Sequence, residues 1–227
     1  MTVLDTPLDQ PLSIAMRDGS RAEHEAAEGS SFVGELMAGR VDETGYAAYL
    51  RRLRAVYAAL ETAGRERADD PYVAAVRDVA LERLDALDAD LDHWAPDVSH
   101  DLAPGESPAA AAYVDRLEAS AAWGGLFVAH HYTRYLGDLS GGQAIGRTLD
   151  REFGLEGRGT DFYRFAAIPK PKPYKDSYRA RLDALTSSHD DKARVVAEVQ
   201  VAFQLNRALF VELGTHLPAW RRTPREG

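Results

Sequence analysis

Four side chains near the start of the chain combine residue types that bind iron and carboxylates. They are Arg17, Arg21, His24 and Glu28, and their spacing of 4, 3 and 4 residues places them on one face of a helix. A neutral imidazole is a common axial ligand of iron, and a carboxylate one turn away would orient it through its second nitrogen. The two guanidinium groups would bind carboxylates of the same ligand. Because a solvent-exposed helix face has the same pattern, this stripe alone leaves a binding role and a structural role open.

A second candidate region is rich in glycine. Residues 137–146 read Gly-Asp-Leu-Ser-Gly-Gly-Gln-Ala-Ile-Gly and hold four of the 18 glycines of the chain, with a helical pattern on both sides. Each glycine inside a helix costs about 1 kcal/mol relative to alanine. We therefore expect a bend whose backbone approaches a flat ligand closely, beside the charged pair Arg134 and Asp138. An ordinary helix–turn–helix with glycine caps is the alternative, and a phosphate-binding loop is disfavoured because no strand precedes the segment.

The spacing of apolar residues predicts the elements that position these groups. It is helical nearly everywhere and shows no convincing strand alternation. A second helix is expected to begin at a cap formed by Asp42 or Thr44 and to extend past Leu60. The other expected helices span about 12–28, 73–94, 108–120, 123–136, 147–153, 174–186 and 190–213. We predict one all-α domain over residues 1–227, with flexible tails at about 1–10 and 217–227 and the longest loop at 95–108.

Composition excludes several classes of function. With 45% hydrophobic and 28% charged residues, the 227-residue chain has enough apolar material for one sizeable core. The chain has no cysteine, which excludes disulfides, thiolate zinc sites, iron–sulfur clusters and a cysteine nucleophile. The net charge of −9 argues against a nucleic-acid partner. No apolar stretch is long enough for a transmembrane helix and no signal pattern is visible, so we expect a cytoplasmic protein without a membrane partner.

Four segments together resemble one protein family. Residues 129–143, Ala-His-His-Tyr-Thr-Arg-Tyr-Leu-Gly-Asp-Leu-Ser-Gly-Gly-Gln, closely resemble the signature of heme oxygenases. The stretch around His24 resembles the family's proximal helix, residues 174–182 its basic propionate-binding segment, and residues 201–210 its last pocket helix. These segments follow the family's order and extend over nearly the whole chain.

The resemblance implies an all-helical fold in which heme lies between a proximal helix and a glycine-kinked distal helix. It also implies a reaction in which heme is both cofactor and substrate. Heme would be cleaved to biliverdin, CO and ferrous iron with O2, for the release of iron. The electrons would come from a ferredoxin with its reductase or from an NAD(P)H-dependent reductase, because the chain has neither a dinucleotide-binding fingerprint nor a cysteine.

Carried over residue by residue, the resemblance implies roles on both sides of the heme. His24 would be the axial iron ligand and Glu28 its hydrogen-bond partner. On the distal side, Asp138 would anchor water with the support of Arg134 and Tyr57. The glycines implied to bring the distal backbone against the porphyrin, or to relax the helix there, are Gly137, Gly141 and Gly142.

The same resemblance implies how heme is held at its edges. The residues that would face the propionates are Arg17, Arg21, Tyr132, Lys175 and Arg179. Phe203 and Phe210 would line the pocket, and Asn206 would join the water network. The family often has lysine where this chain has Arg17 and Arg21, so the seating of heme, and with it the site of ring opening, is less well defined than heme binding.

Two other functions are weighed against heme degradation. One is a non-degrading heme-binding or trafficking protein on the same scaffold, which would have no need of Asp138 and its water. The other is a helical enzyme of related fold without heme, similar to a thiaminase. His24, the basic residues and the lack of a cysteine nucleophile argue against this last class.

Overall fold

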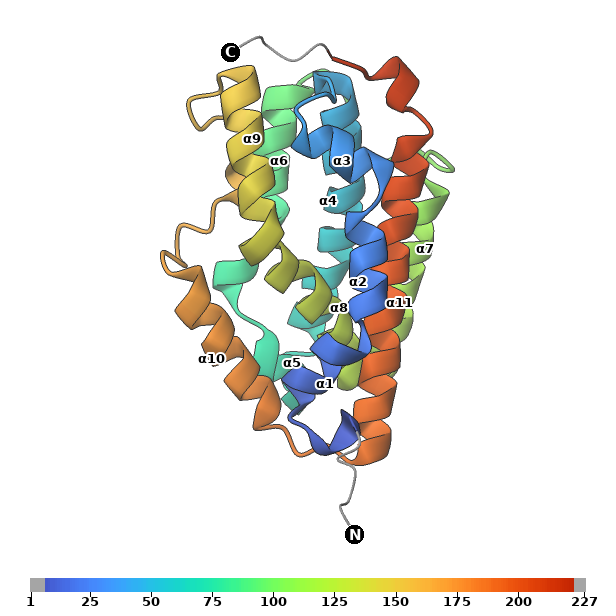
Figure 1. Cartoon of the computed structure of the whole chain (residues 1–227), viewed down its shortest axis with the longest axis vertical. Helices are drawn as coiled ribbons and strands as arrows, with labels where there is room; N and C mark the ends of the chain where they lie inside the picture. The colour runs from blue at the N-terminus through green and yellow to red at the C-terminus, as the bar shows by residue number, and fades with distance from the viewer. Residues whose placement is uncertain (1–6, 223–227) are drawn as a thin grey trace.

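The computed structural model describes residues 7–222, and the regular elements of this part of the chain are helical (Figure 1). One isolated antiparallel bridge joins Val41 to Arg221. The α-helices are α1 (Leu12–Gly19), α2 (Arg21–Glu28), α3 (Ser31–Met37), α4 (Glu43–Glu66), α5 (Pro71–Val76), α6 (Leu84–Trp94), α7 (Pro108–Ala119), α8 (Gly124–Gly137), α9 (Gln143–Phe153), α10 (Pro171–Asp183) and α11 (His189–Gly214). A single π-helical turn, Asp138–Gly142, joins α8 to α9.

Short polar side chains start several of these helices. Asp42 accepts a hydrogen bond from the backbone N–H of Gly45 at 2.8 Å, which confirms it as the cap of α4. Asp70 caps α5, whose first residue is Pro71, and Ser188 begins α11 with a full capping box. The helix starts are therefore encoded locally, whereas the stability of the helices comes from burying their apolar faces.

The helices α4, α8 and α11 carry much of the helix packing. α11 packs along α8, and α4 packs against α6 and α7. In Figure 1, α11 runs along one side with α1 and α2 beside it, and α9 and α10 lie on the opposite side. Most of the residues predicted for the site lie on α1 and α2 or on α8 and the turn that joins it to α9. None of the helices in the described part of the chain is long and apolar enough to cross a membrane.

Two predicted helices are interrupted. The helix expected over residues 12–28 is divided into α1 and α2 at Ser20, whose hydroxyl donates to the carbonyl of Met16 at 2.8 Å. Gly19 allows the break because Val196 of α11 lies where a side chain would be. The pattern expected to continue from 73 to 94 is divided at residues 77–83, where Asp78 caps a short 3-10 turn.

The described parts of the two predicted tails are held against the fold. The side chain of Lys192 donates to the carbonyls of Leu8 and Gln10 at 3.1 and 2.7 Å, so residues 7–10 are held against α11. At the other end Leu217 is buried, and the backbone N–H of Arg222 donates to the carbonyl of Arg40 at 3.0 Å. The predicted tails at residues 1–6 and 223–227 lie outside the described residues.

Candidate active site

A cavity of about 700 Å³ separates α1 and α2 from the α8–α9 pair. Its walls also include residues of α3, α10 and α11. All the site residues predicted from the sequence line this cavity except Tyr57 and Lys175. The structure therefore brings both candidate regions, the charged stripe and the glycine-rich segment, to one cavity from opposite sides.

The predicted bend in the distal helix is a π-helical turn. The chain keeps helical dihedral angles through Asp138–Gly142, where the hydrogen bonds widen by one residue. The hydroxyl of Ser140 donates to the carbonyl of Leu136 at 2.7 Å, and the amide of Gln143 donates to the carbonyl of Tyr163 at 2.7 Å. This turn presents both its backbone and Asp138 to the cavity.

The four glycines of this segment divide into two pairs. A Cβ atom added at Gly137 or Gly141 would meet no atom within 4 Å, because both positions face the cavity. A Cβ added at Gly146 would lie 2.9 Å from Cβ of Tyr163, and one at Gly142 would lie 3.3 Å from its Cδ1. Gly137 and Gly141 therefore keep the cavity open beside the backbone, whereas Gly142 and Gly146 let the helix pack closely on Tyr163.

Asp138 is held in a buried hydrogen-bonded network. It accepts a hydrogen bond from the hydroxyl of Tyr57, and its Oδ1 lies 3.7 Å from Nη2 of Arg134. Arg134 donates from Nε to the Tyr57 hydroxyl at 3.2 Å and from Nη1 to Oδ1 of Asn206 at 2.5 Å. Tyr57 stands behind the cavity wall and reaches the cavity only through these partners. Three helices, α4, α8 and α11, therefore fix one carboxylate.

Burial governs the protonation of this network. It raises the pKa of Asp138 above the usual range, although Arg134 and Tyr57 act in the opposite direction. Burial also raises the pKa of Tyr57 well above its usual value, so this phenol stays protonated and donates a hydrogen bond to Asp138. The result is a carboxyl group at the cavity wall that keeps its proton to a higher pH than an exposed aspartate does.

His24 lies on the opposite side of the cavity, on α2. Its side chain is 49% exposed, and its Nε2 lies 3.5 Å from Oε1 of Glu28, one turn further along the helix. The imidazole packs edge-on against Phe203, with ring centroids 5.3 Å apart. Phe210 continues the apolar wall and contacts Tyr49 at 6.1 Å between centroids. The predicted partners His24 and Glu28 therefore lie next to each other on α2, with the contact made at Nε2.

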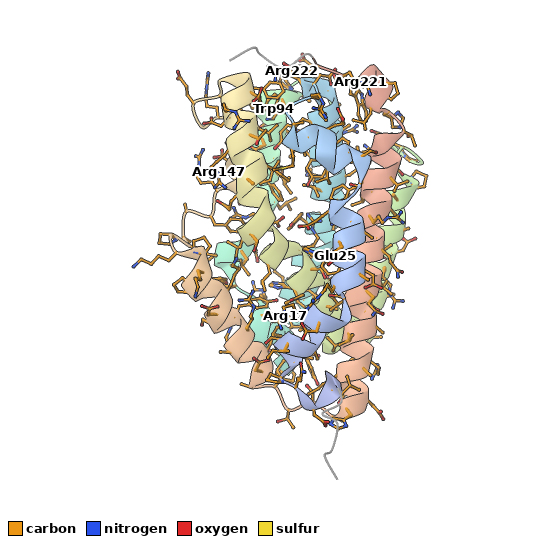
Figure 2. The ribbon with its side chains drawn as sticks, viewed as in Figure 1. Arg17, Glu25, Trp94, Arg147, Arg221 and Arg222 are labelled. Carbon is orange, nitrogen blue, oxygen red and sulfur yellow. The ribbon has the colours of Figure 1, made fainter. Side chains whose placement is uncertain are left out.

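Basic residues gather at one end of the cavity. Arg17 and Arg21 both pair with Asp18, at 2.8 and 3.4 Å, and their side chains are 63% and 68% exposed. Arg17, which is labelled in Figure 2, lies on α1. From the other side, Arg179 of α10 lines the cavity, and its charge lowers the pKa of Tyr132 against the dominant effect of burial. Arg17, Arg21 and Arg179, which we call the basic mouth, therefore bring three guanidinium groups to the cavity, and each contacts Asp18 or Asp176.

Lys175 stands one step back from this group. Its ammonium donates to the hydroxyl of Ser140 at 2.7 Å, and Ser140 itself lines the cavity. Burial and the neighbouring charge of Arg179 lower the pKa of Lys175. The structure thus links Lys175 to the π-turn. Lys175, predicted to face the propionates, is not among the cavity-lining residues.

Comparison with known proteins decides the family. The family model for heme oxygenase matches residues 10–212. This chain belongs to the heme oxygenase family. The heme oxygenase of Porphyra purpurea is 35% identical over 209 residues, which cover 91% of this chain and 88% of that protein.

Solved structures of the heme oxygenase family have the same fold. Heme oxygenase-2 of Synechocystis, solved in complex with heme and NO, has a TM-score of 0.85 and 33% identity, covering 92% of this chain and 88% of that one. Heme oxygenase-1 of the same cyanobacterium, solved in complex with heme, has a TM-score of 0.84 and 34% identity, covering 92% and 95%. The predicted all-helical fold and family are confirmed.

Among the cavity-lining residues of this heme oxygenase family member that were not predicted, two carry phenol groups. Tyr49 of α4 and Tyr163 of the 3-10 turn Asp161–Tyr163 both line the cavity. Tyr49 belongs to an apolar helical stripe, where a tyrosine is indistinguishable from an ordinary core residue. Tyr163 follows the loop after α9, and its only signal in the sequence is its place in the segment Phe-Tyr-Arg-Phe at 162–165.

Proposed function

We propose that this chain oxidatively cleaves heme to biliverdin, CO and ferrous iron, using O2 and electrons from an external donor. Membership of the heme oxygenase family supports this activity. The observation that carries it is the pairing across one cavity of the His24 imidazole with the π-turn, whose backbone is open at Gly137 and Gly141 and whose carboxylate is Asp138.

The cavity residues fit heme. A porphyrin needs a flat space, apolar walls and one protein ligand on its iron. Gly137 and Gly141 leave space against the distal backbone that any side chain would fill, while Phe203 and Phe210 supply apolar walls. His24 offers an imidazole whose other nitrogen is oriented by Glu28. His24 would therefore bind the heme iron, and these residues would line the heme pocket.

The basic mouth would hold the two propionate carboxylates. Arg17, Arg21 and Arg179 supply guanidinium groups that form charge-assisted hydrogen bonds to carboxylates, and Tyr132 adds a phenol. Lys175 adds positive charge from behind Ser140. Because the charged groups are gathered at one end, heme would enter with its apolar edge first and leave its propionates at the solvent.

When bound, heme supplies an iron that activates dioxygen and a macrocycle that is oxidised. The chain contributes position and protons. Gly137 and Gly141 carry no side chain that would occupy the space in which the macrocycle would lie. Asp138 would hold a water in the cavity and pass it protons, with its geometry maintained by Tyr57, Arg134 and Asn206. A protein that only carries heme has no use for such a network.

Electrons must reach the cavity from another protein. The chain has no cysteine for an iron–sulfur cluster, and we propose a ferredoxin with its reductase, or an NAD(P)H-dependent reductase, as the donor. We place the reaction in the cytoplasm, where a chain without disulfides is at no disadvantage. The physiological purpose would be the release of iron from heme.

Two linked measurements test this proposal. Titration of the purified chain with hemin should give a sharp Soret band that saturates at one equivalent. Addition of a reductant system under air should then replace this band with the absorption of biliverdin, identified by product chromatography. Binding without degradation under several donors would instead favour the non-degrading heme-binding protein, and absence of a Soret band would contradict both functions.

A further inference from the structure

The helix that carries His24 buries little of its own surface. Of the eight residues of α2, only Ala27 is buried. A helix of this length is not stable by itself, and the burial of one alanine adds little to its stability. In Figure 1, α2 lies along α11, and the two helices pack against each other. The position of His24 therefore depends on how α11 holds the backbone of α2.

The break between α1 and α2 gives α11 a backbone group to bind. α1 ends at Gly19, and the last carbonyl groups of a helix have no partner within it. Backbone bonding resumes one residue later, where the carbonyl of Ser20 accepts from the N–H of His24 at 3.0 Å. The carbonyl of Gly19 itself accepts a hydrogen bond from Nε2 of Gln200, on α11, at 2.6 Å. A side-chain amide of α11 therefore holds the backbone directly before the proximal helix.

Two neighbours of Gln200 on α11 contact the same region. A Cβ atom added at Gly19 would lie 2.5 Å from Cγ1 of Val196, so the backbone there rests directly on α11. One turn beyond Gln200, Phe203 packs against the imidazole of His24 with ring centroids 5.3 Å apart. Residues 196, 200 and 203 share one helix face. This face of α11 therefore contacts both the start of the proximal helix and its histidine.

α11 is itself attached to other helices. The buried carboxylate of Glu198 lies 2.8 Å from Nε2 of His130 and accepts from Nε of Arg116 at 2.8 Å. Further along, Asn206 joins α11 to the distal network of Asp138 through Arg134. Buried hydrogen bonds of this kind are strong and well oriented. Gln200 thus extends from a helix whose position relative to the distal side is already fixed.

We propose that Gln200 is a positioning residue for His24. Its amide holds the carbonyl of Gly19 and so determines where α2, and with it the imidazole, stands in relation to the distal side of the cavity. Gln200 does not line the cavity and acts only through the backbone. This role rests on the proposed function, in which His24 binds the heme iron. The alternative is that Gln200 stabilises the helix packing without any effect on the imidazole.

Hydrogen exchange of the hemin-free full chain tests whether Gln200 holds α2. Gln200→Leu removes the donor at similar volume, so the amides of residues 20–28 should exchange about fivefold faster than in the native chain. Gln200→Lys keeps a donor for the carbonyl and should restore slow exchange. The matched control is Gln204→Leu, one turn further along α11, where the side chain is exposed and does not line the cavity. This control should exchange as the native chain does.

Resonance Raman spectra of the ferrous hemin complexes test whether this hold positions the imidazole. In Gln200→Leu the iron–histidine stretching band should shift and broaden, and the affinity for hemin should fall about fivefold. Both effects should be reversed in Gln200→Lys and absent in Gln204→Leu.

The outcomes separate this role from the proposed function. Exchange rates that are equal in Gln200→Leu and Gln204→Leu would overturn the role of Gln200. Faster exchange with an unchanged iron–histidine band would also overturn it, because Gln200 would then stabilise the helix without positioning His24. Absence of this band from the native complex would instead contradict the assignment of His24 as the iron ligand, and the proposed function would fail with it.

Discussion

The two sides of the cavity are built in opposite ways. On the distal side, the side chains of Arg134 and Asp138 are only 5% and 10% exposed, and their partners come from α4 and α11. On the proximal side, the side chains of His24 and Arg17 are 49% and 63% exposed, and their partners are neighbours on the same short helices. The distal groups are ordered by the fold, whereas the proximal groups have little to hold them before a ligand arrives.

This difference separates the two tasks of the site. Buried, hydrogen-bonded groups interact strongly and need no rearrangement when charge develops, so the distal network is suited to chemistry. Exposed ion pairs are screened by water and contribute little to stability, so the proximal and basic residues can change partners when a ligand binds. We therefore expect distal substitutions to reduce turnover at nearly constant affinity, and substitutions at the exposed side to reduce affinity.

His24 should break this rule, because a bond to iron is stronger than any screened ion pair. We expect His24→Ala to retain its helical circular dichroism and some hemin binding through the basic mouth, while biliverdin formation stops. Added imidazole should restore part of the activity. The coordination is read from the Soret band and from electron paramagnetic resonance.

Unchanged spectra in His24→Ala would move the ligand to another histidine. His130 and His131 are both buried and already bonded, to Glu198 at 2.8 Å and to the Tyr178 hydroxyl at 2.9 Å. Neither lines the cavity, so we expect neither to replace His24.

Asp138→Ala should lower turnover while leaving the affinity for hemin nearly unchanged. Removal of the carboxylate leaves His24 and the basic residues untouched, so the affinity for hemin should change by less than about threefold. Loss of positioned proton transfer should lower the rate of biliverdin formation by about 100-fold or more. Single-turnover absorption with product chromatography measures both, and native rates in this variant would leave Asp138 as a structural partner of Arg134.

The features of this site that depend on residues close together in the sequence could be predicted. Helical periodicity and caps such as Asp42 follow from neighbouring residues, and a cluster of glycines in a helix is costly enough to indicate a function. The break at Ser20 was not predictable, because it depends on Val196 from a distant helix packing against Gly19.

The contribution of two tyrosines to the cavity wall could not be predicted for a similar reason. Tyr49 and Tyr163 carry the signature of core residues, and only the fold shows that their rings border a cavity. The stripe of Arg17, Arg21, His24 and Glu28 was predicted as a unit although it spans two helices. Its residues still reach one cavity because α1 and α2 both contribute to the same cavity lining (Figure 1).

The two pairs of glycines offer a test within a single helix. Gly141→Ala should raise the Tm of the hemin-free chain by about 2–4 °C, because alanine favours the helix by about 1 kcal/mol and its Cβ meets no atom. The same methyl group occupies space against the cavity, so the affinity for hemin should fall by roughly tenfold, or about 1.4 kcal/mol.

Gly146→Ala should do the reverse. Its Cβ would lie 2.9 Å from that of Tyr163, and such overpacking costs about 1–3 kcal/mol. The Tm should therefore fall, while hemin binding by the folded protein stays nearly native. Differential scanning calorimetry and hemin titration of both variants give the comparison, and equal effects at the two positions would show that Gly141 does not face the ligand.

The smallest effect is expected at the exposed mouth, for Arg179→Ala. A charge-assisted hydrogen bond contributes about 1.5–3 kcal/mol when well shielded, but the side chain of Arg179 is 40% exposed, which reduces this to about 1 kcal/mol. Affinity for hemin should fall about fivefold, and more at low salt than at high salt.

The matched control is Lys172→Ala on the same helix, because Lys172 is 88% exposed, pairs with the same Asp176 and does not line the cavity. Since Arg179 would also set the angle at which heme sits, the ratio of biliverdin isomers should shift in Arg179→Ala and stay constant in Lys172→Ala. If neither affinity nor isomer ratio differs between the two variants, Arg179 is an ordinary surface residue, and the seating of heme depends on Arg17 and Arg21 alone.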